Sequence, residues 1–236
     1  MIKNIFRADS RGHFDYGWLK TYHSFSFSNY FDSSRVHFGA LRVVNDDFIQ
    51  AGTGFDTHPH ENMEIITIIL TGSIKHRDST GTEEILTENE VQIMSAGRGV
   101  RHSEFNPSDE EDLTLFQIWI LPEQKNIDPR YDQKKFNPAD RKNKFHLLVS
   151  PKNSTDHLFI NQQAFLSRAD FDAGTEINYE PYNSLNGTFI MVISGNAVID
   201  GEELNPRDSI SVGRSNCIPI KADTDVELLI IEIPLN

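Results

Sequence analysis

Short runs of β-forming residues recur along nearly the whole chain, with turn residues between them about every 8 to 12 positions. Three of the clearest are MEIITIILTGSIKHRDSTG (63–81), EEILTENEVQIMSAG (83–97) and LTLFQIWILP (113–122). The first pattern breaks at a Thr-Gly pair, and the second turns at Glu-Asn-Glu. This spacing is typical of β-sandwiches and barrels. Because no long amphipathic helix pattern interrupts it, we predict an all-β fold.

Two further patterns bear on how the strands are organised. The segment HFGALRVVNDDFIQAG (37–52) holds two short β-rich runs around Asn-Asp-Asp, which predicts a hairpin. Later, IMVISGNAVIDGEEL repeats the order of IITIILTGSIKHRDS, namely apolar strand, glycine, strand and turn. The repetition indicates an internal duplication. We expect an N-terminal β domain over 1–125, a polar connecting segment over 126–144 and a C-terminal β domain over 145–236.

Composition restricts the class of protein. The 236 residues carry a net charge of −13, which works against direct binding of nucleic acid, since such binding rests on neutralising phosphates with Lys and Arg. No window approaches the roughly 20 apolar residues of a membrane span, and the N-terminus has no apolar stretch of signal-peptide length. The single cysteine, Cys217, suits a reducing compartment. We therefore expect a cytoplasmic protein in which Cys217 is a small buried side chain.

Two distant segments each carry a pair of metal-ligand residues. THPHENMEIITIIL contains His58 and His60, and SAGRGVRHSEFN contains His102 and Glu104. Side chains at i and i+2 of a strand point to the same face, so each pair presents its two groups together. If the two segments form neighbouring strands, all four groups converge. Pro59 favours an extended backbone at His58.

Three imidazoles and one carboxylate suit a first-row transition metal. The lack of thiolate ligands argues against a Cys-rich structural zinc site. Around an octahedral ion, four protein ligands leave two positions for water, dioxygen or a chelating substrate. We predict one divalent transition metal, Fe(II) in first place, with Cu, Ni, Mn and Zn also compatible. The other histidines are predicted to be structural or solvent-facing: His13, His23, His37, His76, His146 and His157.

Several ordered strings resemble the cupin superfamily and, more closely, the pirin family. They are RGHFDYGWLKTYHSFSFSNYFD, GALRVVNDD, THPHENMEII, QIMSAGRGVRHSEFNPS and LFQIWILP, which together cover most of residues 10–122. The resemblance implies a double cupin, that is, two β-barrel domains with metal in the N-terminal barrel only. Where a second His-x-His would stand, the sequence has Glu180 and Tyr182, so no second metal site is expected.

The resemblance also implies a ligand set. The pirin pattern maps its four ligands to His58, His60, His102 and Glu104. The broad cupin motif would instead use Glu64, which strand parity also places on the face of His58 and His60. We predict Glu104 as the ligand and Glu64 as a group that orients a ligand or serves as a general base.

Some pirins are described as quercetin 2,3-dioxygenases and others as metal-dependent regulators. The first hypothesis is therefore a mononuclear dioxygenase that combines dioxygen with a quercetin-like flavonol or a related aromatic or enediol-type hydroxy-ketone. Its catalytic residues would be Glu104 and Glu64 as candidate proton acceptors. The alternative is a non-catalytic, metal-loaded regulator that binds a protein partner. A roomy apolar cavity above the metal favours the enzyme, and a flat charged face near Arg98 and Arg101 favours the regulator.

Overall fold

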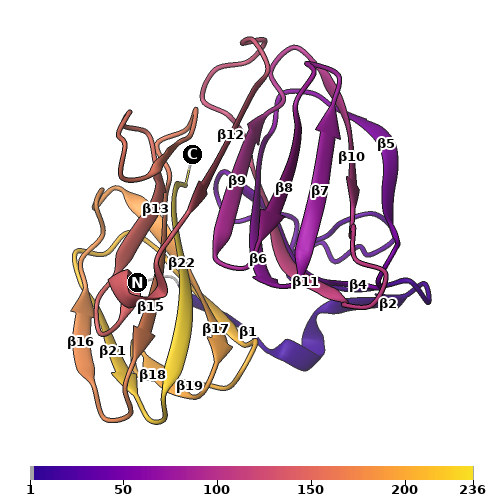
Figure 1. Ribbon diagram of the computed structural model, residues 1–236. Coiled ribbons are helices and arrows are strands. Elements are labelled where there is room, and N and C mark those ends of the chain that lie inside the picture. The colour runs from indigo at the N-terminus through magenta and orange to yellow at the C-terminus, as the bar shows by residue number, and fades with distance from the viewer. Residues whose placement is uncertain (1–2, 236) are drawn as a thin grey trace.

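The computed structural model describes residues 3–235, which form β-strands and two short 3₁₀ helices, η1 (Ala8–Ser10) and η2 (Pro138–Arg141). The strands form two lobes, one built mainly from β2 to β12 and the other mainly from β13 to β22 (Figure 1). In this described part of the chain, no helix has both the length and the apolar character needed to cross a membrane. The predicted all-β double-barrel architecture is confirmed.

The N-terminal barrel pairs a seven-stranded sheet with a four-stranded sheet. The larger sheet has the order β12 (Arg130–Lys135), β9 (Glu90–Ser95), β6 (Glu64–Thr71), β11 (Leu113–Ile120), β4 (Leu41–Ile49), β3 (Leu19–His23) and β2 (Gly12–Asp15). The smaller sheet has the order β5 (Gly54–His60), β10 (Val100–Phe105), β7 (Ser73–Asp78) and β8 (Glu83–Thr87). All neighbours in both sheets are antiparallel.

The C-terminal barrel repeats this plan with a second pair of sheets of seven and four strands. The larger has the order β1 (Lys3–Phe6), β20 (Ser209–Val212), β17 (Asn186–Ser194), β22 (Val226–Pro234), β15 (Phe165–Phe171), β13 (His146–Ser150) and β14 (Leu158–Phe159). The smaller has the order β16 (Glu176–Tyr179), β21 (Ile218–Ala222), β18 (Ala197–Ile199) and β19 (Glu202–Leu204). The N-terminal strand β1 thus completes the C-terminal barrel, while β12, from the connecting segment, extends the N-terminal one.

The two large sheets pack against each other through a shared apolar core. On β6, Ile65 and Ile69 point into the N-terminal barrel. The alternate residues Ile66 and Ile68 point the other way, into a cluster that includes Phe189 of β17 in the C-terminal barrel. Both faces of β6 are therefore buried, which explains why IITIIL lacks the apolar-polar alternation of a half-exposed strand.

The predicted hairpin over residues 37–52 is wrong. The segment contains one unbroken strand, β4, and Asn45 and Asp47 lie in the middle of that strand, nearly fully buried. They pair with His23 and Thr21 of β3. Their side chains point into the barrel. Asn and Asp are also typical turn residues, so the sequence pattern predicted a turn where the strand continues.

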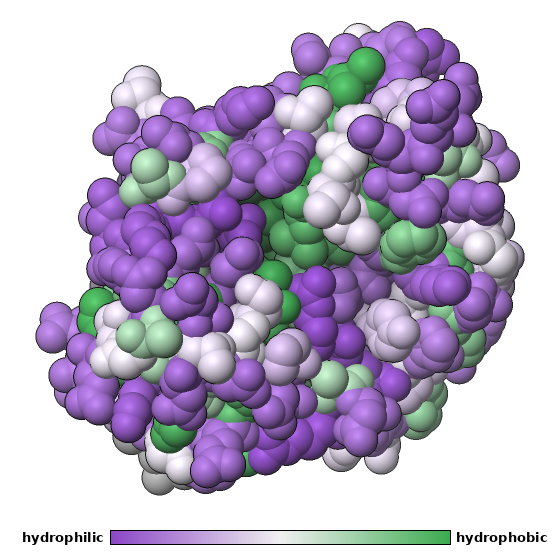
Figure 2. All heavy atoms as spheres, turned by 60° about the horizontal axis from the view of Figure 1, so that its bottom comes forward, coloured by the Kyte–Doolittle hydropathy of each residue, from purple (hydrophilic) through white to green (hydrophobic). Residues whose placement is uncertain are grey.

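On the face shown in Figure 2, hydrophilic residues cover most of the area, and hydrophobic residues gather mainly in a hollow near its centre. Cys217 is exposed rather than buried. It lies in the loop before β21, where its backbone N–H donates to the Ser215 Oγ, and this turn leaves the thiol outside the barrel.

The shared core generates a stability prediction. Phe189 is 0% exposed, and its ring centroid lies 5.7 Å from that of Phe25 and 6.0 Å from that of Phe6. The substitution Phe189→Ala should lower the free energy of unfolding by about 3 to 5 kcal/mol, since a large cavity opens between the barrels. Phe31→Ala removes a side chain that is 77% exposed and should change stability by less than about 0.5 kcal/mol. Urea denaturation followed by circular dichroism measures both, and equal midpoints would contradict the shared core.

Candidate metal centre

Strand register gathers the candidate ligands on the inner face of the smaller sheet. Strand β10 lies between β5 and β7. Its residue His102 is paired with His58 on one side and with Asp78 on the other. Two residues further along, Glu104 is paired with His76 of β7. Because residues at i and i+2 share a face, three neighbouring strands present imidazoles and carboxylates to one place.

Two overlapping groups of side chains have ligand atoms close enough for one metal ion. In the first, the ligand atoms of His58, His60 and His102 all lie within 4.8 Å of one another; in the second, those of His76, His102 and Glu104 do so. The ring centroids of His58 and His102 are 4.5 Å apart, and those of His60 and His102 are 4.9 Å apart. The two groups meet at His102, with His58 and His60 on one side and with Glu104 and His76 on the other.

The backbone around the ligands explains how the sequence builds this site. Gly97 and Gly99 have φ of +49° and +130° and form the turn that leads into β10. A Cβ at Gly97 would lie 2.1 Å from the carbonyl oxygen of Ile127, so the close approach as well as the positive φ requires glycine. Pro59 sits on β5, an edge strand, where a missing N–H costs no ladder bond.

The nitrogens of the imidazoles are arranged to bind a cation. His58 donates from Nδ1 to the carbonyl oxygen of Asp56 at 2.7 Å, which leaves the Nε2 lone pair free. His102 Nε2 is buried and has no hydrogen-bond partner in the described structure, which is costly unless a ligand occupies it. Burial lowers the pKa of His60 to about 4 and that of His102 to about 3. Both rings are thus neutral at pH 7, the form in which imidazole ligates metals.

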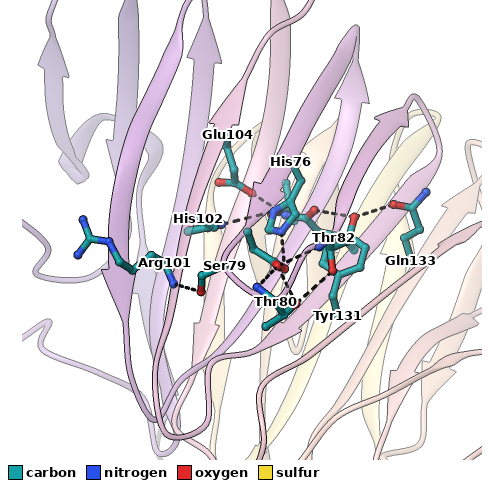
Figure 3. A network of polar contacts seen from close by, with 12 residues as sticks. His76, Ser79, Thr80, Thr82, Arg101, His102, Glu104, Tyr131 and Gln133 are labelled. Atoms are coloured by element: carbon teal, nitrogen blue, oxygen red, sulfur yellow. Dashed lines mark hydrogen bonds and ion pairs between the residues drawn. The ribbon is translucent and has the colours of Figure 1, made fainter.

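A chain of hydrogen bonds fixes the orientation of His102, as Figure 3 shows. Asp78 Oδ2 accepts from His76 Nε2 at 3.1 Å, and His76 Nδ1 lies 3.4 Å from His102 Nδ1. If His76 donates to Asp78, its Nδ1 accepts from His102, and the lone pair on His102 Nε2 stays available for a metal ion. Burial would raise the pKa of Asp78, but hydrogen bonds from Thr80, His76 and the backbone of Thr82 outweigh it and lower the pKa. The carboxylate form that this chain needs is therefore favoured.

Two amide groups hold the carboxylate of Glu104. Gln92 Nε2 donates to Oε1 at 2.6 Å, and Gln117 Nε2 donates to Oε2 at 2.9 Å. Gln117 in turn accepts from Trp119 Nε1 at 3.1 Å. Glu104 is 1% exposed, so its position is set by these donors rather than by solvent.

A cavity of about 380 Å³ adjoins the ligands. It is lined by a set of aromatic and apolar side chains together with a set of polar ones. The first set is Tyr16, Trp18, Leu19, Phe27, Phe55 and Trp119. The second is Thr21, His23, Ser28, Asn45, Asp47, His58, His60, Glu104 and Gln117. This volume and lining suit a small, flat aromatic ligand.

Glu64 does not share the face of His58 and His60, so the parity argument fails for it. Residues 61–63 leave the strand, with Asn62 at φ 49°, and Glu64 begins β6 in the other sheet. Its carboxylate accepts from Ser95 Oγ at 2.9 Å and from the Asn161 N–H at 3.2 Å. Burial raises its pKa, and these hydrogen bonds oppose the rise. Glu64 lies outside both candidate metal groups and is not among the residues that line the cavity.

Two histidines set aside in the sequence belong to the site. His76 is 0% exposed and contacts His102, and His23 is buried in the cavity wall. For His76 the sequence did contain a signal, because His76-x-Asp78 repeats the spacing of the other two pairs. For His23 no comparable local signal exists, since the polar residue beside it, Asn45, lies on β4 and not on its own strand.

Two barrels of this topology, with a His/Glu metal-binding group inside the first, define a double cupin. Comparison with known families gives the same result: the pirin model matches residues 6–120, and the quercetinase C-terminal cupin domain model matches residues 147–233. The chain belongs to the pirin family, which confirms the resemblance seen in its sequence.

Individual relatives cover almost the whole chain. Quercetin 2,3-dioxygenase of Escherichia coli K12 is 42% identical over 228 residues, which is 97% of each chain. A pirin-like protein of Caulobacter vibrioides is 38% identical over 225 residues, 95% of this chain and 96% of the relative. The crystal structure of the bacterial pirin YhhW from Escherichia coli in complex with nickel(II) covers 100% of both chains at 40% identity, with a TM-score of 0.93.

The hydrogen-bond chain generates a prediction on metal affinity. His76→Phe keeps a buried ring but removes the link between Asp78 and His102, so Ni(II) affinity should fall by roughly 10- to 100-fold. His37→Phe, at an exposed loop position, is the matched control and should leave affinity unchanged. Competition titration against a coloured chelator gives both values. Wild-type affinity in a folded His76→Phe protein would show that the chain does not position His102.

A second prediction concerns Asp47. Burial raises the pKa of this carboxyl to about 7, with a hydrogen bond from Thr21 opposing the rise and the charges of Asp46 and Glu104 adding to it. The folded protein therefore holds this proton at pH values where the unfolded chain has released it. As a result, the part of the free energy of unfolding that Asp47 contributes falls as pH rises through about 4 to 7. The contribution is up to about 1.4 kcal/mol per pH unit.

Asp47→Asn removes this contribution. In metal-free protein, the stability of the variant relative to wild type should therefore be greater at about pH 7.5 than at about pH 5. Urea midpoints at the two pH values measure the difference. A relative stability that stays constant or declines with pH would mean that Asp47 is ionised in the folded protein throughout.

Proposed function

We propose that this protein is a mononuclear metal-dependent dioxygenase that acts on quercetin-like flavonols or a related chelating hydroxy-ketone. The observation that carries the proposal is the juxtaposition of the His/Glu group with an aromatic-walled cavity of about 380 Å³. The cavity is large enough for a planar ligand whose oxygens reach the ligand cluster. The similarity to quercetin 2,3-dioxygenase of Escherichia coli over 97% of the chain supports the same reaction class.

The proposal assigns one divalent metal to four ligands: His58, His60, His102 and Glu104. Their donor set fits Fe(II), which we propose as the working metal, and it also accepts Ni, Cu, Mn or Zn. Nickel(II) is bound by a related bacterial pirin. When bound, the metal supplies a Lewis acid that favours the deprotonated form of a chelating substrate hydroxyl.

The side chains of the protein have three tasks in this reaction. Glu104 lines the cavity and is the proposed acceptor of the substrate's hydroxyl proton. Gln92 and Gln117 hold both of its oxygens, so the acceptor is already oriented when substrate enters. Trp119 packs edge-on against His60, with ring centroids 4.8 Å apart, and offers an apolar wall that displaces water from the ligand. Glu64 has no part in this step, because it does not line the cavity.

The alternative, a non-catalytic regulator that binds a protein partner, is not favoured. The cavity beside the candidate ligands is concave and combines aromatic walls with polar groups, the feature expected for a small-molecule site. In the loop before β10, Arg98 is paired with Asp128 at 2.5 Å rather than standing in an open basic patch.

Oxygen consumption with quercetin tests the proposal. Protein loaded with Fe(II) should consume dioxygen, and Glu104→Gln should lower kcat/KM by about 100-fold or more, because it loses both a ligand and a proton acceptor. His37→Phe is the control for handling and should match wild type. Metal content, measured on every sample, separates loss of the ion from loss of the proton acceptor. The proposal fails if none of the five metals gives turnover above that of the same free metal ion.

A further inference from the structure

A row of polar side chains crosses the inner face of the larger N-terminal sheet. Register places His23 beside Asn45, Asn45 beside Gln117, Gln117 beside Thr67, and Thr67 beside Gln92. Five neighbouring strands thus contribute one polar residue each at the same level of the barrel. At one end of the row the function is clear, because Gln117 and Gln92 hold the carboxylate of Glu104.

At the other end of the row, His23 and Asn45 each have a side-chain atom without a partner, and so does Asp47, two residues further along β4. His23, Asn45 and Asp47 are 3%, 3% and 4% exposed. His23 Nδ1, Asn45 Oδ1 and Asp47 Oδ1 are buried and make no hydrogen bond within residues 3–235. All three residues line the cavity that adjoins the metal-binding group. Buried polar atoms left unpaired cost about 1 to 3 kcal/mol each, so a purely structural cluster would be expected to pair them internally.

The cavity around this cluster has several aromatic walls and no fixed positive charge. Trp18, Phe27 and Phe55 are among its walls, and within the described chain no Lys or Arg lines it. Burial lowers the pKa of His23 to about 4, so this imidazole is neutral at pH 7. An anionic group placed here would meet no counter-charge from these walls, whereas a neutral hydroxyl can both donate and accept hydrogen bonds.

We propose that His23, Asn45 and Asp47 form a distal recognition subsite, which hydrogen-bonds hydroxyl groups that an uncharged planar aromatic substrate carries away from its metal-chelating oxygens. This inference rests on the proposed function, because it assigns the chelating end of the same substrate to the metal. It selects hydroxylated aromatic compounds over analogues with the chelating group alone. It also explains why β4 carries Asn and Asp in the middle of a buried strand.

Anaerobic binding to Ni(II)-loaded protein tests the subsite without turnover. The two probes are quercetin, which carries ring hydroxyls, and 3-hydroxyflavone, which has the same chelating hydroxy-ketone and no other hydroxyl. Asn45→Leu should weaken quercetin binding by about 10-fold and 3-hydroxyflavone binding by less than about 2-fold. Asn178→Leu, at an exposed position of β16, is the matched control and should change neither affinity.

A second variant covers the case in which Asn45→Leu does not fold. His23→Phe keeps a ring in the wall and removes its nitrogens, and it should discriminate between the probes in the same direction. Circular dichroism and metal content are measured for every sample.

Each outcome bears on a definite claim. Equal weakening of both probes, or of neither, overturns the subsite and leaves the dioxygenase proposal standing. Discrimination between the probes without oxygen consumption supports the subsite and overturns the dioxygenase. Absence of binding by either probe to the wild-type protein overturns both.

Discussion

The antiparallel register of β10 between β5 and β7 is the constraint on which the site depends. It sets His102 opposite His58 and opposite Asp78, and Glu104 opposite His76. A slip of one residue would turn every one of these side chains to the other face of the sheet. Glycines in the turn before β10 and the irregularity between His102 and Glu104 are therefore part of the site as much as the ligands are.

The packing of the two barrels supports this arrangement from behind. Because β6 and β11 bury their outer residues against the C-terminal barrel, their inner faces are held in a fixed position relative to the smaller sheet. Those inner faces carry polar residues at one level only, among apolar neighbours. A C-terminal barrel with no candidate metal group in its described residues thus contributes to the site by holding the sheet that positions Glu104.

Sequence patterns predicted much of this protein, and the failures share a cause. The strands over 63–97 and 113–122 and the pairs His58/His60 and His102/Glu104 follow from side-chain period and turn chemistry, which are local. The two barrels followed from the resemblance to the pirin family. The false hairpin at Asn45 arose because polar residues inside a barrel have the same composition as a turn. The predicted face of Glu64 was wrong because the alternation of side chains was extended across residues 61–63, where the chain leaves the smaller sheet and enters the larger one. The ligand roles themselves stay predictions.

The sequence by itself determined which residues within one strand share a face, because the direction of a side chain along a strand alternates with a period of two. It also determined the chemistry of the ligands, through the types of residue placed at those positions. Only the tertiary structure decided that His76 and His23 join the site and that Glu64 does not. The reason is that strand adjacency and register are set by contacts between distant segments, which no local pattern records.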